Sequence, residues 1–239
     1  MPKTPPIETN SKDAGTALNR LLDIMARLRS PEGCPWDAEQ TPESLKPYLV
    51  EETYEVLDAL DRNKPAAIRE ELGDLLLQIV FHARIFEERG LFSMADVVGT
   101  IVDKLIRRHP HVFNGVEAGD AARLRAQWDR IKAEEQRTEG KSPSIPRQLP
   151  ALQKATKLAN KTFPGTESRE ELQQLALLEL QQLATWSPEE PRDILKNRFA
   201  SLLFTLARMG NALQIDSEDA LRQYTNRLQE EQFSDKTDA

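Results

Sequence analysis

The chain has 239 residues, of which 39% are hydrophobic, 30% charged and 6% aromatic, a composition typical of a globular protein rather than a fibrous or wholly disordered one. Its net charge of −7 argues against a general binder of nucleic acid or of anionic membranes. Cys34 is the only cysteine, which excludes an intrachain disulfide and favours a reducing, cytoplasmic compartment, and no apolar run is long enough to span a bilayer.

A polar tail and a first amphipathic helix are predicted before residue 31. Residues 1–14 are polar and proline-rich, so we expect a flexible tail. Between 17 and 28, five apolar side chains recur at helical spacing: Leu18, Leu21, Leu22, Met25 and Leu28. Pro31 ends this pattern because proline disfavours helix in the residue before it. In the following loop, Trp36 either stacks on a flat ligand or closes one end of a helix bundle.

Two further helices, at about 41–60 and 66–88, each carry two carboxylates three residues apart. The four acids are Glu52 and Glu55 on the first helix and Glu71 and Asp74 on the second. Glu52 lies beside the apolar stripe and Glu55 further round, on a second face, so the pair is not simply opposite the core. The second helix is apolar nearly all round between 72 and 85, as in a buried helix. Since buried carboxylates are costly without a cation or hydrogen bonds, this pattern predicts a metal site.

A basic group follows the acids on the next predicted helix, residues 94–109. The end of this helix and the residues just after it gather basic side chains: Lys104, Arg107, Arg108, His109 and His111. These residues either form a solvated helix end or bind phosphate, for which lysine and arginine are suited. A helix at 120–137 then carries Trp128, which is either a core residue or a stacking platform. The histidines are expected to cap or pin the loop rather than to bind a metal.

The second half of the chain repeats the apolar pattern of the first. With a shift of 127 positions, Leu75 to Leu77 align with Leu202 to Phe204 without a gap over residues 48–79. The acids are lost in this copy: Glu52 aligns with Glu179, but Glu55, Glu71 and Asp74 align with Gln182, Arg198 and Ser201. We therefore expect a helical second copy without a metal site, against the alternative that two Leu-rich helical stretches align by chance.

The type of metal follows from the type of ligand. Four carboxylates without a cysteine or a clear histidine ligand form an all-oxygen site, which suits Mg²⁺, with Mn²⁺ as a second possibility. A di-iron bundle is disfavoured, because none of the three histidines is preceded by Glu at i−3. Mg²⁺ commonly completes its coordination with water and substrate phosphates, so acids followed by a basic group point to a phosphorylated substrate.

Five sequence blocks in order resemble the MazG family of nucleoside triphosphate pyrophosphohydrolases. They are PWD at 35–37, EETYE at 51–55, EELGDLL at 70–76, DKLIRRHPHVF at 103–113 and WDRIK at 128–132. The resemblance is close over 17–137. It implies an all-α fold of two tandem MazG-like helical bundle repeats, with a catalytic domain at 15–137, a linker at 138–150 and a degenerate domain at 151–239. It also implies a homodimer, and the net charge and short apolar runs favour a protein that binds neither nucleic acid nor membrane.

The same resemblance implies Mg²⁺-dependent hydrolysis of an NTP or dNTP to the monophosphate and pyrophosphate, a role in nucleotide-pool housekeeping. The implied metal ligands are Glu52, Glu55, Glu71 and Asp74; Glu51 or Glu70 activates the water; Lys104 and Arg108 contact the triphosphate; Trp128 and Lys132 lie near base or phosphate; Trp36 is a candidate for the base pocket. The alternative function is a regulatory protein that binds a nucleotide or an alarmone without turnover.

Overall fold

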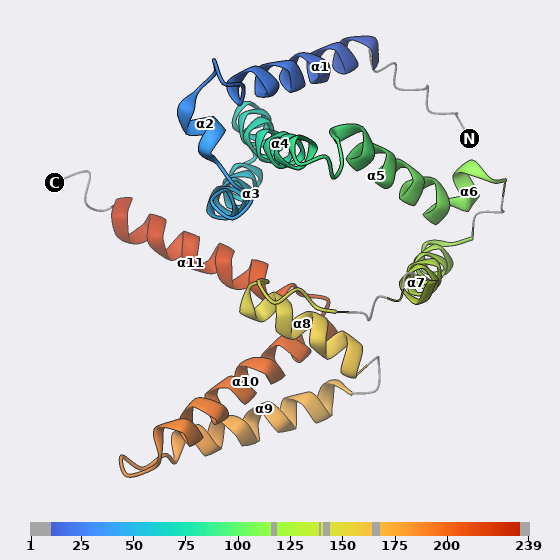
Figure 1. Cartoon of the computed structure of the whole chain (residues 1–239). Coiled ribbons are helices and arrows are strands. Elements are labelled where there is room, and N and C mark those ends of the chain that lie inside the picture. The colour runs from blue at the N-terminus through green and yellow to red at the C-terminus, as the bar shows by residue number, and fades with distance from the viewer. Residues whose placement is uncertain (1–10, 116–118, 139, 141–143, 164–167, 235–239) are drawn as a thin grey trace. The chain divides into compact units, whose positions relative to one another are not determined.

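The computed structural model describes residues 11–115, 119–138, 140, 144–163 and 168–234, and every regular element within these ranges is an α-helix (Figure 1). The all-α prediction is therefore confirmed. The chain divides into two compact units at Lys132–Ala133. This division falls within helix α7 (Ala121–Thr138), so the domain and linker boundaries predicted at 137 and 150 stay proposals. Residues 1–10 of the predicted tail lie outside the described part, and α1 already begins at Ser11.

Unit 1 is built around one long helix, α4 (Pro65–Glu88), which packs against α3 (Lys46–Asp61), α1 (Ser11–Leu28) and α5 (Met94–Arg108). Its core contains Met25, Leu45, Val80, Phe81 and Ile85. Three of these five side chains come from the C-terminal half of α4, so that half forms the core. The N-terminal half of α4 faces α3 and carries the acids.

Local chemistry sets the ends of these helices. A three-residue turn, Arg62 to Lys64, reverses the chain between α3 and α4, with Asn63 at a φ of 50° in the left-handed region that asparagine tolerates. Pro65 then starts α4, where the proline needs no backbone donor. After α4 the chain turns at Gly90, whose φ of 67° suits glycine, and α5 begins with a capping box between Ser93 and Asp96.

Arg29 holds the loop after α1 against the end of α4, and Gly33 lets that loop turn tightly against the end of α1. The Arg29 guanidinium donates to a carboxylate oxygen of Glu88 at 2.9 Å and also to the backbone carbonyl oxygens of Asp37 and Gln40. Gly33 lies so close to the Arg27 and Leu28 carbonyl oxygens that a Cβ atom would fall 2.2 Å from both. The tight turn therefore requires glycine, and Arg29 ties it to α4.

Unit 2 arranges its helices in the same order and around the same central element. Helix α10 (Arg192–Ala212) packs against α9 (Arg169–Ala184), α8 (Ala151–Thr162) and α11 (Ser217–Ser234). The start of α10 lies 127 positions after the start of α4, the shift at which the apolar patterns align. Helices α9 and α10 thus correspond to α3 and α4, which agrees with two tandem helical repeats.

Three predictions about unit 1 need correction. The loop around Trp36 contains a short helix, α2 (Pro35–Glu39). Thr41 and Ser44 bond to one another's backbone N–H in a turn before α3, and the residue that caps α3 is Leu45, without a side-chain hydrogen bond. Helix α4 is not buried all round: Leu72 is 50% and Ile79 40% exposed. Its apolar pattern overstates burial within one chain, because an apolar face can be covered by another chain.

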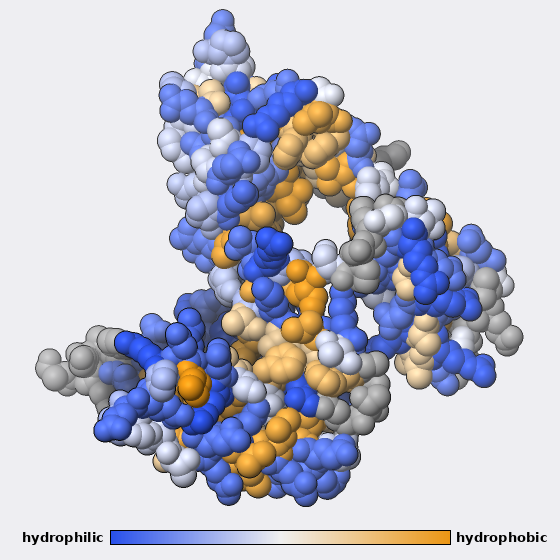
Figure 2. All heavy atoms as spheres, turned by 60° about the horizontal axis from the view of Figure 1, so that its bottom comes forward, coloured by the Kyte–Doolittle hydropathy of each residue, from blue (hydrophilic) through white to orange (hydrophobic). Residues whose placement is uncertain are grey.

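Apolar side chains reach the surface of both units, where they interrupt the polar surface in the view of Figure 2. In unit 1 they form a stripe along α4 and a second stripe along α5. The first consists of Leu72, Leu76 and Ile79, and the second of Val98, Ile101, Val102 and Leu105. Among the described residues, no helix combines the length and the apolar character that crossing a membrane requires.

Candidate metal and nucleotide site

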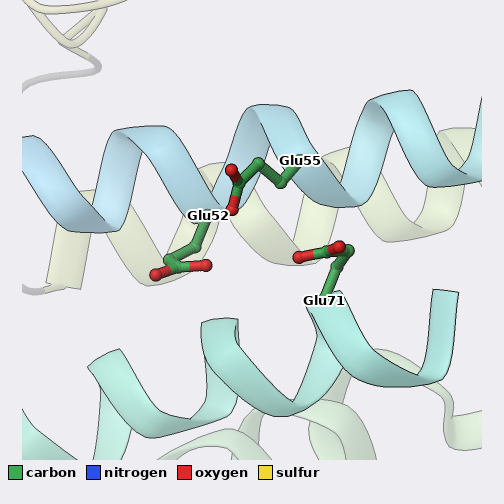
Figure 3. Close-up of side chains that lie close together, drawn as sticks. All are labelled: Glu52, Glu55 and Glu71. Carbon is green, nitrogen blue, oxygen red and sulfur yellow. The ribbon is translucent and has the colours of Figure 1, made fainter. Parts of the chain in front are cut away.

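Three of the four predicted acids come together where α3 faces α4. One carboxylate oxygen from each of Glu52, Glu55 and Glu71 lies within 4.8 Å of the other two. Figure 3 shows the carboxylates of the two helices turned toward one another. The three-residue spacing places Glu52 and Glu55 on one side of α3, and the tight turn brings Glu71 of α4 opposite them. Glu52 and Glu71 are half-buried, and Glu55 is exposed.

Asp74 belongs to the same electrostatic group although it is not one of the three closest acids. Burial raises the pKa of Glu52 above its ordinary value, and the negative charges of Asp74 and Glu55 raise it further. Partial burial likewise raises the pKa of Glu71, with added repulsion from Glu55, Glu70 and Asp74. These shifts mean that the carboxylates repel one another when all are ionised. A cation between them would remove that cost.

The donor set fits a hard divalent cation. Each of the three glutamates offers a carboxylate oxygen, and within the described residues theirs is the one group of three or more acids, histidines or cysteines close enough to hold an ion. Oxygen-only ligands suit Mg²⁺ and Mn²⁺, whereas zinc and copper sites commonly include sulfur or imidazole ligands. The partial exposure of the group also leaves room for water and a phosphate oxygen in the remaining coordination positions.

The two candidate water-activating acids are sequence neighbours of cluster members. Glu51 precedes Glu52, and Glu70 precedes Glu71. Both side chains are exposed. Glu70 is near enough to Glu71 to raise the pKa of that neighbour. The single chain therefore brings neither acid into the close group, and the choice between them stays open.

The predicted basic and aromatic residues form a second feature of unit 1. The Trp128 ring on α7 lies under two cations: the guanidinium carbon of Arg108 is 5.1 Å from the ring centroid and the Lys132 Nζ is 5.0 Å from it. A pocket of about 520 Å³ opens beside them. Its lining consists of Arg108, His109, His111, Leu124, Arg125, Trp128 and Asp129. Lys104, one turn before Arg108 on α5, is half-buried and does not line the pocket.

Sequence reasoning missed part of this pocket. His111 and Arg125 line it, although the sequence pattern assigns only a loop-pinning role to the histidine and singles out no role for the arginine. The expected capping role holds for His109, whose Nδ1 lies 2.8 Å from the Leu105 carbonyl oxygen at the end of α5. One signal could have identified Arg125: it lies three residues before Trp128 on the same helix, a spacing that places both on one side.

Trp36 contacts Tyr48, an aromatic residue that precedes the acids on α3. Its ring packs edge-on against Tyr48, with centroids 6.3 Å apart and planes at 77°. Tyr48 stands one turn before Glu52 on α3. Trp36 is 53% exposed, so it does not close the end of the bundle as a buried plug. The four-residue spacing from Tyr48 to Glu52 is the sequence signal that links this aromatic pair to the acids.

The corresponding part of unit 2 is held together by its own side chains. The Ser201 hydroxyl donates to Glu179 Oε1 at 2.5 Å. The Arg198 guanidinium donates to the Gln182 carbonyl oxygen at 3.3 Å and forms an ion pair with Glu190 at 2.8 Å. Arg198 stands at the position of Glu71, so a guanidinium occupies the place of a cluster acid. Arg198 is thus neutralised by Glu190, while Glu179 is bonded through Oε1 alone and its buried Oε2 has no hydrogen-bond partner among the described residues.

Comparison with known proteins identifies the family of this chain. Residues 40–113, which contain all four acids of the cluster and its surroundings, match the model of the MazG nucleotide pyrophosphohydrolase domain. A Thermotoga maritima protein named nucleoside triphosphate pyrophosphohydrolase/pyrophosphatase MazG is 42% identical over 225 residues, covering 92% of this chain and 85% of that protein.

Two further relatives match a shorter stretch. A nucleoside triphosphate pyrophosphohydrolase of Escherichia coli K12 is 50% identical over 145 residues, and one of Mycobacterium tuberculosis is 42% identical over 145 residues. These matches cover 59% and 58% of this chain, and 55% and 43% of the respective relatives. The chain thus spans about half the length of these two proteins, whereas it spans most of the Thermotoga relative.

Proposed function

Because the chain belongs to the MazG family of nucleotide pyrophosphohydrolases, we propose that it hydrolyses nucleoside triphosphates to the monophosphate and pyrophosphate with Mg²⁺, in nucleotide-pool housekeeping. The observation that carries the proposal is the group of three glutamate carboxylates within 4.8 Å, on helices inside the family match. Burial and mutual repulsion raise the pKa of Glu52 and of Glu71. A cation bound between these carboxylates would relieve that repulsion.

The chain's own residues divide the work of binding. Glu52, Glu55, Glu71 and Asp74 are the proposed metal ligands. When bound there, Mg²⁺ supplies charge neutralisation on the phosphates and a more acidic water for attack at the α-phosphorus. Glu51 or Glu70 accepts the proton from that water, and their exposed positions beside the cluster leave both carboxylates accessible to it.

Cationic and aromatic side chains hold the rest of the substrate. Arg108 can present a planar fork to phosphate oxygens, and Lys104 and Lys132 act as mobile point charges. Trp128, already under two cations, offers a face for a base or a backing for the phosphate-binding groups. Trp36 with Tyr48 forms a separate aromatic surface on the acid side of unit 1. We assign Trp36 to the base pocket.

A homodimer is part of this proposal. The apolar stripes of α4 and α5 are between 36% and 50% exposed in the single chain, and such contiguous apolar faces mark interaction surfaces. A second copy covering α4 would complete the burial that the sequence of this helix predicts. The single cysteine agrees with the cytoplasmic location that we propose for the dimer.

Phosphate release tests the proposed activity. The protein is incubated with a panel of NTPs and dNTPs, Mg²⁺ or Mn²⁺, and an added inorganic pyrophosphatase. We expect phosphate only when the pyrophosphatase is present, since the direct product is pyrophosphate. Release without it would indicate cleavage at another phosphate. Nucleotide binding without any release would support the regulatory alternative instead.

A further inference from the structure

Two buried polar atoms on α4 have no hydrogen-bond partner within the described residues: Oε1 of Gln78 and Nε2 of His82. Gln78 is only 7% exposed. Burial lowers the pKa of His82 below its ordinary value, against an opposing effect of Glu43, so the imidazole is neutral at neutral pH. A buried polar atom without a partner is costly, which makes two on one helix a feature that requires an explanation.

These residues continue the line of acids along α4. Glu71, Asp74, Gln78 and His82 follow one another at spacings of three, four and four residues. At about 100° per residue their directions fall within about 80° of one another, so they share one side of the helix. Gln78 thus stands one turn beyond Asp74, and His82 one turn beyond Gln78. The metal-site side of the helix extends into the interior as a polar line.

Unit 2 provides a comparison within the same chain. At the shift of 127 positions, Gln78 corresponds to Thr205 and His82 to Met209. Thr205 is 1% exposed, so the position is as buried in the second copy as in the first. The copy that has lost the acids has therefore also lost both long polar side chains. This joint loss links Gln78 and His82 to the acid cluster rather than to the packing of the repeat.

We propose that Gln78 and His82 are positioning residues that hold the carboxylate of Asp74 through a hydrogen-bond chain. Neutral His82 donates its Nε2–H through one bridging water to Gln78 Oε1, and the Gln78 amide N–H donates to an Asp74 carboxylate oxygen. The hydrogen bonds then all run in a single direction and end on an anion, where such bonds are strongest. Partners of this kind orient metal ligands and tune metal affinity.

This inference rests on the proposed metal site, and it is tested by metal affinity in the full-length protein. Gln78→Met and His82→Phe remove the polar atoms at similar volume, and Thr205→Val is the matched control in unit 2. Mn²⁺ binding is measured by electron paramagnetic resonance, together with kcat, KM and unfolding by denaturant without metal. We expect Gln78→Met to weaken Mn²⁺ binding at least about 10-fold and to lower kcat more than it raises KM.

The metal-free readout separates positioning from structure. Because Gln78→Met removes the proposed partner of both His82 and Asp74, it should lower metal-free stability modestly, and Mn²⁺ should stabilise this variant less than it stabilises wild type. Nitrogen-15 shifts of the His82 ring should report a neutral ring protonated on Nε2, altered in Gln78→Met. Mn²⁺ affinity equal to that of wild type in both variants, or equal weakening in Thr205→Val, overturns the inference.

The wild-type protein distinguishes failure of the inference from failure of the proposed function. Wild type that binds Mn²⁺ but releases no pyrophosphate refutes the activity, while weaker Mn²⁺ binding by Gln78→Met still supports the hydrogen-bond chain. Wild type that binds no divalent ion refutes both. If Gln78→Met does not fold, His82→Phe, farther from the acids, decides the inference by the same measurements.

Discussion

The helix pairs α3–α4 and α9–α10 share an arrangement and differ in charge. Glu52, Glu55, Glu71 and Asp74 of the first pair carry four formal negative charges, whereas Glu179 and Arg198, the ionised residues at the same positions of the second pair, cancel. The first pair gathers carboxylates that repel one another, while the second joins Arg198 to Glu190 and Ser201 to Glu179. One helical framework thus supports either a group of acids that a cation would stabilise or a pair of contacts within the chain.

The fold and the site are therefore encoded by separate residues. The apolar positions that make α10 pack like α4 persist in both copies, so packing does not depend on the acids. Replacement of Glu71 by an arginine supplies positive charge from within the chain. A repeat can therefore lose a metal site without losing its structure, provided that the remaining acid finds a new partner.

Removal of single acids should give the largest difference in activity between variants of the two copies. Glu71→Gln or Asp74→Asn should lower kcat/KM for NTP hydrolysis at least about 100-fold, because a direct ligand matters no less than the residues that orient it. The helical circular dichroism spectrum should be retained. Glu179→Gln, in unit 2, should leave the rate unchanged. A rate loss in Glu179→Gln as large as in Asp74→Asn would contradict the proposed division of labour.

Restoring the acids to unit 2 should give that unit a metal response of its own. The triple variant Gln182→Glu, Arg198→Glu, Ser201→Asp is made in the Glu71→Gln background, which weakens the response of unit 1. We expect Mn²⁺ at about 100 times its dissociation constant to stabilise the triple variant by about 2.7 kcal/mol, measured by denaturant unfolding. Arg198→Gln in the same Glu71→Gln background is the control and should show no such gain. A folded triple variant without a Mn²⁺ response would mean that the backbones of the two copies also differ.

The pH dependence of metal-free stability should reveal the repulsion among the acids of unit 1. The folded-state pKa of Glu52 and of Glu71 is raised, so protonation favours the folded state. The resulting stability is fully present below the ordinary glutamate value of 4.5 and is lost as the pH rises through the raised pKa. We therefore expect Glu71→Gln to stabilise the metal-free protein at neutral pH, with the difference from wild type shrinking as the pH falls toward 4.5. Saturating Mg²⁺ should reverse the ranking, and an identical pH profile for the two proteins would refute this account.

The smallest expected effect concerns the ion pairs of Glu88 with Arg29 and Arg84. Unit 2 has Ile215 at the corresponding position and therefore lacks them. Despite the opposing effect of burial, hydrogen bonds from Arg29 and Arg84 lower the pKa of Glu88. Its stabilising contribution is therefore present above pH 4.5 and is lost as the pH falls through the lowered pKa. Glu88→Gln should cost about 1 kcal/mol at neutral pH and less in acid, by denaturant unfolding. Ile215→Val is the control and should show no pH-dependent difference.

Much of the fold and part of the site were predictable from the sequence. The extents of α4 and α5 followed from the apolar spacing, since this signal acts over a few residues. The carboxylate spacing likewise predicted which acids face one another. The exposure of Leu72 was not predictable, because hydrophobic periodicity shows that a face is covered but not by which chain.

Other parts of the site depend on contacts between distant segments. The pocket beside Trp128 joins the end of α5 to α7, and no local pattern states that Arg125 and His111 face the same space. The internal ion pair of Arg198 with Glu190 was also not predicted, because Glu190 lies in the connection between α9 and α10. Sequence comparison of the repeats showed that the acids were lost, but only the structure shows what replaced them.

The short turn between α3 and α4 has a consequence for how the protein folds. All four proposed ligands lie in one helical hairpin closed by Arg62 to Lys64, so they meet through contacts that are local in sequence. Docking of α1 onto α4 closes a much longer loop and is therefore slower. A chain with α1 still detached can already present its ligands, and divalent ions should then accelerate refolding rather than only slow unfolding.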